Sequence, residues 1–94
     1  MRPIGEVIRE LRKEQNLSQG ELCDLIKISA TSLSQIENNI KRPHYSTLEK
    51  IALALKTTAS VIYIFQLERT DIQKNKRMAF DIIFPAFKKT IVNT

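Results

Sequence analysis

The sequence is poor in the residues that build disulfides, metal sites and sheets. Its 94 residues contain one cysteine, one histidine, two glycines, three prolines and no tryptophan. The single Cys23 excludes an intrachain disulfide or a cysteine-based metal cluster, and it suits a small buried hydrophobe. Few turn residues are available for a sheet, and no segment alternates cleanly with a period of two. Periods near 3.6 dominate, so we predict an all-α fold in a chain that suffices for one small domain.

The spacings on which common enzymes depend are also missing. The chain has no G-x-S-x-G, no P-loop and no H-E-x-x-H. His44 has no cluster of Cys, His, Asp or Glu near it, which argues against a metal site. The acidic residues are scattered over helix surfaces, so no acid–base pair can be proposed. We therefore expect no enzyme activity, no metal and no cofactor.

No long apolar run is present. The most apolar stretch, residues 59–67, is far shorter than the roughly 20 residues that span a bilayer. Met1 leads directly into a helix start, without the apolar run of a signal peptide. We expect a soluble, cytoplasmic protein with no membrane partner. The net charge of +5 and the pI near 9.6 favour an anionic partner, nucleic acid before membrane, although a merely soluble basic domain has the same composition.

Two short helices with a tight turn between them are predicted in the stretch SQGELCDLIKISATSLSQIENN. Ser18 opens the first helix as an N-cap, and Glu21 completes an S-x-x-E capping box three residues later. Leu22, Leu25 and Ile26 then share one helical face, which we expect to be buried.

The second helix of this stretch, residues 29–38, has an outer face almost without charge. Ser29 is its candidate N-cap, and Leu33 and Ile36 lie three apart on the buried side. The opposite side carries small or amide side chains, namely Ala30, Thr31, Ser34, Gln35 and Asn38. A solvated helix face would carry Lys and Glu, whereas short hydroxyls and amides suit a groove that is read by hydrogen bonds.

Three more helices are predicted from the same signals. Residues 3–15 carry a buried stripe made by Ile4, Val7, Ile8 and Leu11. Ser46 and Glu49 form another capping box, which opens a helix with Leu48, Ile51, Ala52 and Leu55 on its core face. A helix at about 59–69 is apolar on nearly all sides. One side can close the core, and the other needs the tail or another subunit as partner.

The tail, residues 70–94, carries an aromatic stripe. Its side chains recur at intervals of four, three and four, at Phe80, Phe84, Phe87 and Ile91. Because Pro85 biases the preceding residue away from α, we predict two short helices, at about 73–83 and 86–92. The stripe, together with Ile62 and Phe65, is the candidate surface for tail packing or dimerisation, within one subunit or between two.

Residues 4 to about 67 resemble the phage-repressor and Cro-type, or XRE-like, helix-turn-helix family. The matching segments are Leu17-Ser18-Gln19, Glu21-Leu22, residues 34–38 (S-Q-I-E-N), Lys41-Arg42-Pro43 and residues 48–55 (L-x-K-I-A-x-A-L). The resemblance implies a five-helix, lambda-repressor-like domain at 1–69 with a short helical extension at 70–94. The family commonly places Gly where this chain has Lys27 and Asn39. A positive φ there costs Lys about 1 kcal/mol and is tolerated better by Asn.

The resemblance further implies a sequence-specific transcriptional regulator, a repressor or autoregulator, that binds double-stranded DNA. The helix at 29–38 would lie in the major groove, with Ala30, Thr31, Ser34 and Gln35 facing base edges. The residues expected at the DNA backbone are Gln19, Ser29, Asn38, Lys41 and Arg42. The two adjacent cations follow the reading helix directly, although loops are often basic. The reading face offers no Arg or Lys to guanine, which favours an A·T-leaning centre.

Arg12 and Glu37 are expected to form a structural ion pair. In the resembled family an Arg at this place pairs with the Glu that follows the last apolar residue of the reading helix. Glu37 is also the only acid on an otherwise uncharged helix, which favours the pair over a solvated Arg12.

Family resemblance also implies a homodimer. The alternative is an antitoxin or accessory module whose apolar tail holds a protein partner. Such a protein co-purifies with another chain, whereas the regulator forms a homodimer and shifts duplex DNA.

Overall fold

The computed structural model describes residues 1–68, 71 and 76–92, with the side chains of residues 91 and 92 excepted. This part of the chain contains six helices and no strand. The helices are α1 (Ile4–Glu14), α2 (Gln19–Ile26), α3 (Ala30–Glu37), α4 (Tyr45–Ala54), α5 (Ala59–Phe65) and α6 (Arg77–Val92). The all-helical class is confirmed, and α5 ends earlier than the predicted 59–69.

Side-chain caps decide where three of the helices begin. The Ser18 hydroxyl accepts the Glu21 N–H, and the Glu21 carboxylate accepts the Ser18 N–H, which confirms the capping box of α2. Ser29 caps α3, and Thr58 caps α5. The capping box predicted at Ser46 is wrong. His44 is the extended residue before α4, so Ser46 already lies inside the first turn.

One apolar core joins α1 to α5. The buried stripe of α1 is confirmed, and α2 contributes Leu22, Cys23 and Ile26. Leu25 was expected on that face, but it is 59% exposed. Cys23 takes its place, because the core side of α2 runs through residues 22, 23 and 26, leaving residue 25 at the edge.

Helix α1 approaches the end of α3 very closely, and a glycine makes this possible. A Cβ atom on Gly5 would lie 2.2 Å from the Ile36 carbonyl oxygen and 2.8 Å from that of Glu37. The Gly5 N–H also donates to Asn39 Oδ1 at 2.9 Å. Only a residue without a side chain fits this contact, which sets the position of α3 on α1.

The tail forms one helix across Pro85, and the predicted break there is wrong. Residues 73–75, where the first tail helix was predicted to begin, lie outside the described residues, as does the Ile91 side chain. The Phe65 ring meets the rings of Phe84 and Phe87 edge-on, with centroids 6.2 and 6.4 Å apart. Because these contacts hold the helix on both sides of Pro85, packing offsets the hydrogen bond that proline cannot donate.

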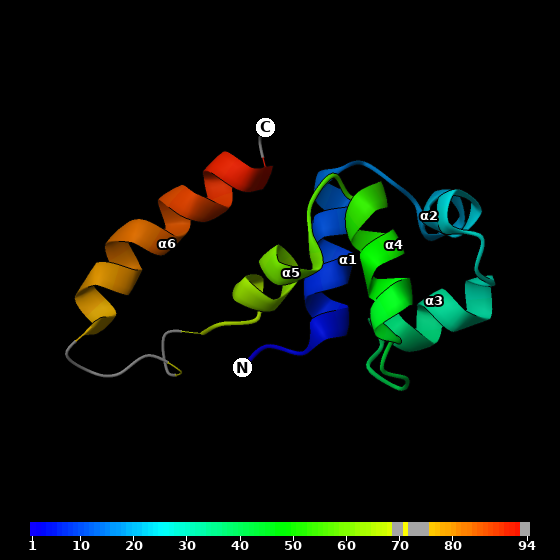
Figure 1. The fold of residues 1–94 in the computed structure, drawn as a ribbon, viewed down its shortest axis with the longest axis horizontal. Coiled ribbons are helices and arrows are strands. Elements are labelled where there is room, and N and C mark those ends of the chain that lie inside the picture. The colour runs from blue at the N-terminus through cyan, green and yellow to red at the C-terminus, as the bar shows by residue number, and fades with distance from the viewer. Residues whose placement is uncertain (69–70, 72–75, 93–94) are drawn as a thin grey trace.

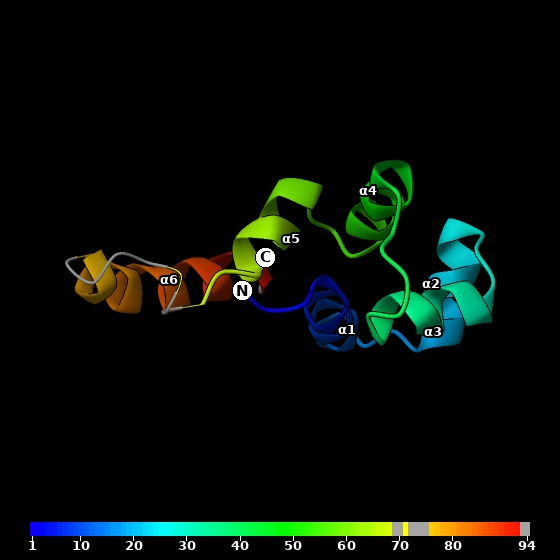
Figure 2. The ribbon, with the colours of Figure 1, turned by 90° about the horizontal axis from the view of Figure 1, so that it is seen from below.

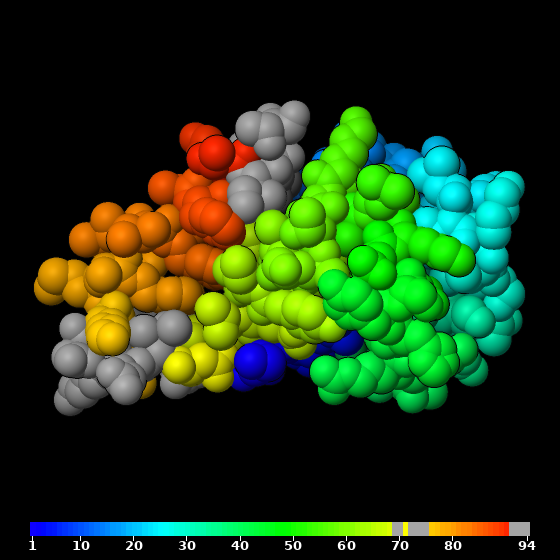
Figure 3. Space-filling view, in the orientation of Figure 1, coloured from blue at the N-terminus to red at the C-terminus, as the bar shows by residue number. Residues whose placement is uncertain are grey.

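Helix α6 lies beside α5, at the end of the molecule away from α2 and α3 (Figures 1 and 2). The space-filling view shows it as a lobe next to the body of the molecule (Figure 3). The tail-packing residues therefore divide into two groups. Ile62 is fully buried in the core, while Phe80 stacks on Phe84 within α6.

No helix among the described residues is long and apolar enough to cross a membrane.

The Gly5 contact predicts a large difference between the two glycines of the chain. Gly5→Ala should destabilise the fold by about 1–3 kcal/mol or more, because backbone atoms must move to admit the methyl group. Gly20→Ala is the matched control, since the nearest atom to its added Cβ is Ser18 Oγ at 3.9 Å. That change should be neutral or stabilising by up to about 1 kcal/mol. Urea unfolding measures both, and equal midpoints would contradict the close approach.

Candidate nucleic-acid interface

The turn between α2 and α3 relies on a left-handed lysine. Lys27 has φ 59° and ψ 46°, the conformation that the family usually gives to glycine. The Cys23 carbonyl accepts the N–H groups of Lys27 and Ile28, which closes the end of α2. Burial raises the pKa of the Cys23 thiol, so it stays protonated, and its Sγ lies 3.7 Å from the Ser29 carbonyl oxygen. The cysteine thus fills the core and spans the turn.

The loop after α3 is folded back onto that helix. Asn39, the other position where the family commonly has glycine, is also left-handed, with φ 60°, and its side chain accepts the Gly5 N–H. The N–H groups of Ile40 and Lys41 both donate to the Gln35 carbonyl. These bonds place Lys41 and Arg42 next to the last turn of α3, where both side chains are exposed. The loop therefore carries two solvent-facing cations beside the helix.

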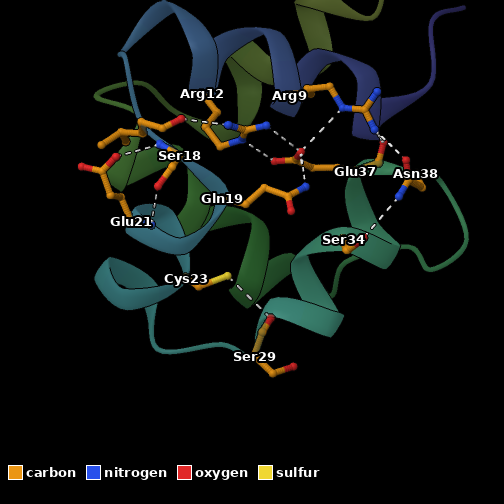
Figure 4. A network of polar contacts seen from close by, with 11 residues as sticks. Arg9, Arg12, Ser18, Gln19, Glu21, Cys23, Ser29, Ser34, Glu37 and Asn38 are labelled. Carbon is orange, nitrogen blue, oxygen red and sulfur yellow. Dashed lines mark hydrogen bonds and ion pairs between the residues drawn. The ribbon is translucent and has the colours of Figure 1, made fainter.

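A buried carboxylate joins α1, α2 and α3 (Figure 4). Glu37 is 1% exposed and receives two bonds from Arg12, Nε to Oε2 at 2.8 Å and Nη2 to Oε1 at 3.1 Å. Gln19 Nε2 donates to Oε1 at 2.9 Å, and Arg9 Nε lies 3.6 Å from the same oxygen. Arg12 also donates to the Leu17 carbonyl at 2.8 Å. The ion pair therefore also fixes the entry into α2.

The surroundings of Glu37 decide its charge. Burial by itself would raise the pKa of this carboxyl group. The hydrogen bonds from Arg12 and Gln19, together with the positive charges of Arg12 and Arg9, outweigh burial and hold the pKa below its ordinary value. Glu37 is thus ionised at neutral pH, and the cluster contains a full negative charge.

The structure divides the candidate base-reading residues by exposure. All four belong to α3. Ala30 and Thr31 are exposed, and Ser34 and Gln35 are half-buried. Leu33 and Ile36 anchor the opposite side of the helix in the core. The polar face is thus held outward by the packing of the apolar face.

Some of the candidate DNA-backbone residues are already hydrogen-bonded within the protein, whereas others have an exposed side chain or a hydrogen-bond donor left. The Ser29 hydroxyl accepts the Ser32 N–H as N-cap, and the Asn38 amide is bonded to Arg9 and Ser34. Gln19, expected at a phosphate, gives one amide hydrogen to Glu37 and has one left. Lys41 and Arg42 are exposed on the loop.

Sequence reasoning missed Arg9, which lies outside the buried stripe predicted for the first helix. Arg9 Nη2 donates to Asn38 Oδ1 at 2.6 Å and to the Glu37 carbonyl at 3.2 Å. Its spacing of three residues from Arg12 was the available signal, because residues three apart share a helix face.

Comparison with known proteins agrees with this geometry. A family model described as helix-turn-helix matches residues 8–62. The chain belongs to the helix-turn-helix family. The ImmF control region 10 kDa protein of Bacillus phage phi105 is 33% identical over 78 residues, which cover 83% of this chain and 81% of that protein. The immunity repressor protein of the same phage is 37% identical over 59 residues, covering 63% of this chain but 41% of that protein. The chain is a DNA-binding transcriptional regulator of this family.

Two solved structures resemble the fold. The structure of the biofilm regulator SinR in complex with DNA matches with a TM-score of 0.61 and 31% identity, covering 64% of this chain and 97% of that one. A SinR–SinI complex matches with a TM-score of 0.62 and 22% identity over 93% of this chain and 98% of that one. At that identity the second likeness concerns the fold alone. The chain spans less than half the length of several other regulators that it matches.

The Glu37 cluster predicts a large, pH-dependent loss of stability. Glu37→Gln should cost about 3–5 kcal/mol at pH 7, because Arg12 then stays buried without its counter-charge. Because folding lowers the Glu37 pKa, its contribution is present above the ordinary glutamate pKa of about 4.3 and is lost as pH falls through the lower folded value. The difference from wild type should therefore shrink below about pH 5.

Urea unfolding between pH 7 and pH 3 measures this difference. Glu14→Gln is the control, since Glu14 is exposed on α1 and the change should be nearly neutral at every pH. A Glu37→Gln penalty that stays constant down to pH 3 would show that the carboxylate is not the stabilising form.

Proposed function

We propose that the protein is a sequence-specific repressor or autoregulator that reads double-stranded DNA as a two-fold homodimer. Residues 1–69 bind the DNA, and residues 70–94 serve packing and assembly. The observation that carries the proposal is the outer face of α3, which offers hydroxyl and amide groups without charge while its inner face is locked into the core. The similarity of this chain to the phage immunity repressor and to SinR in its complex with DNA also supports the proposal.

In this proposal α3 lies in the major groove and α2 crosses the backbone. Gln35 can pair with adenine through two hydrogen bonds, and Thr31 can offer a hydroxyl to a base or its methyl group to thymine. Ala30 can contact a thymine methyl group. Ser34 precedes Gln35, one helical turn after Ala30. None of these side chains matches the guanine contacts of Arg or Lys, so we expect an A·T-leaning centre.

The phosphate contacts come from both sides of α3. Lys41 and Arg42 are exposed on the loop that is bonded to Gln35, so they lie next to the reading helix. On the other side, the N-terminus of α2 offers backbone N–H groups and the remaining amide hydrogen of Gln19. Such contacts fix the register of the helix on the duplex without reading its sequence.

The second copy is the occupant that we propose for the free face of α6. Met78, Ile82 and Ile83 are each more than half exposed there. Beside them runs a groove of about 310 Å³ lined by Ile64, Ala79, Phe80, Ile83, Phe84 and Phe87. The exposed side chains and the groove suit two-fold pairing. Each copy supplies both, so the side chains of one copy can pack into the groove of the other. One helix-turn-helix reads only a half-site, so pairing would bring two reading helices to one operator.

Selection of bound fragments from a random duplex library tests the proposed function. The full-length protein should return one enriched motif with two-fold symmetry, its half-sites about one helical turn apart. Recovery of random sequence would contradict sequence-specific binding.

The loop cations predict a change in the salt dependence of binding. Lys41→Ala and Arg42→Ala should each weaken binding about equally for all sequences and lower the salt slope by roughly one unit. Titrations of operator duplex across a series of salt concentrations measure the slope. Lys89→Ala removes an exposed charge from α6, a helix on the far side of α5 from α3, and should leave the slope unchanged (Figure 1). Unchanged slopes in both loop variants would remove the loop from the interface.

The α6 surface predicts the residue on which dimerisation depends. Ile83→Glu should raise the dimer dissociation constant by about thirtyfold or more, because the charge would enter an apolar interface. Sedimentation should then find mainly the 10.8 kDa monomer, still folded. Leu53→Glu, at a 78% exposed position on α4, is the matched control and should remain dimeric. A wild-type monomer that stays monomeric on operator duplex would contradict the dimer.

A further inference from the structure

Asn38 bridges a cation of α1 and a hydroxyl on the reading face (Figure 4). Its Oδ1 accepts a hydrogen bond from Arg9 Nη2 at 2.6 Å. Its Nδ2 lies 3.3 Å from Ser34 Oγ, one helical turn earlier. The three side chains therefore form a chain of hydrogen bonds that ends on α3, next to Gln35.

The chemistry of Arg9 sets the direction of this chain. A guanidinium group has donors and no acceptor, so the Asn38 atom that faces it must be the oxygen. The amide nitrogen of Asn38 must then face Ser34. That nitrogen can only donate, so Ser34 Oγ accepts, and the hydroxyl hydrogen points elsewhere. Among the described residues, no further hydrogen bond of the Ser34 hydroxyl is present.

The buried carboxylate keeps Arg9 in this position. Arg9 Nε lies 3.6 Å from Glu37 Oε1, and Arg9 Nη2 donates to the Glu37 carbonyl at 3.2 Å. The Glu37 side chain is completely buried. The orientation of the Asn38 amide is thus tied to the same charge that joins the first three helices.

We infer that Arg9 and Asn38 are positioning residues that make Ser34 a hydrogen-bond donor toward the DNA. The inference rests on the proposed function, since it concerns how the α3 face reads a base. A donor selects base edges that present an acceptor, which in the major groove are guanine O6 and N7, thymine O4 and adenine N7. Cytosine presents only an amino group there. Ser34 therefore disfavours cytosine at the base that it contacts.

Asn38→Asp reverses the direction of the hydrogen bond. A carboxylate accepts from Arg9 as the amide oxygen did, and it can only accept from Ser34. The Ser34 hydroxyl then donates to Asp, and its lone pairs face the groove. The discrimination against cytosine at one position should therefore disappear, and the preference should shift toward adenine or cytosine, the bases that present an amino group. The added charge also weakens binding to every sequence.

The experiment is fragment selection by full-length wild type, Asn38→Asp, Asn39→Asp and Ser34→Ala. Asn39→Asp is the matched control: it adds the same charge one residue later, can still accept the Gly5 N–H, and suits the left-handed backbone. We expect wild type and Asn39→Asp to prefer the other three bases over cytosine at one position by about five- to tenfold. Asn38→Asp should lose or reverse this preference, and Ser34→Ala should lose it. Urea unfolding checks that each variant is folded.

The outcomes separate this inference from the proposed function. If folded Asn38→Asp selects the wild-type base at every position with equal strength, the inference is wrong while sequence-specific binding stands. If Ser34→Ala weakens all sequences equally, Ser34 contacts the backbone, and the inference is likewise wrong. If wild type enriches no motif, the proposed function fails and this inference fails with it.

Discussion

The carboxylate of Glu37 is the interaction on which the rest of the structure depends. It is buried where the first three helices meet, and it stays ionised because Arg12, Gln19 and Arg9 surround it with donors and positive charge. An unpaired charge at such a site costs several kcal/mol, so the cluster is stable only when all three helices are in place. The charge thus makes the arrangement of α1, α2 and α3 cooperative.

Cooperativity matters because α3, the helix that we propose reads the DNA, is too short to be stable alone. Helices α2 and α3 have eight residues each, below the length at which isolated helices persist in water. Their caps satisfy only the first N–H groups, and most of their stability comes from burying Leu22, Ile26, Leu33 and Ile36. The same burial turns the uncharged face of α3 outward. Exposure of this uncharged face and packing of the core are therefore one event.

Helix α6 is held by aromatic contacts and not by the buried charge. It is held by the contact of Phe84 and Phe87 with Phe65, and the Lys88 ammonium group lies 5.4 Å from the centre of the Phe65 ring. Among the described side chains of α6, the large apolar ones of Met78, Ile82 and Ile83 are exposed. A helix that is apolar on more than one side needs more than one partner. The core supplies one of these partners, and the proposed second copy supplies the other.

Local sequence signals determined the helical class, the caps at Ser18 and Ser29 and the polar face of α3. Each depends on residues within about one turn of one another, and short-range chemistry decides such features. The pairing of Arg12 with Glu37 needed the family resemblance, because 25 residues separate the partners.

Tertiary structure alone decided the roles of Arg9, Gly5 and Pro85. Arg9 and Gly5 act on the end of α3, some 30 residues away, and no local pattern reports such a contact. Proline breaks helices by local preference, but packing on Phe65 carries α6 through it. Leu25 is exposed because the direction of the core depends on all five packed helices, whereas periodicity defines only the spacing of a face.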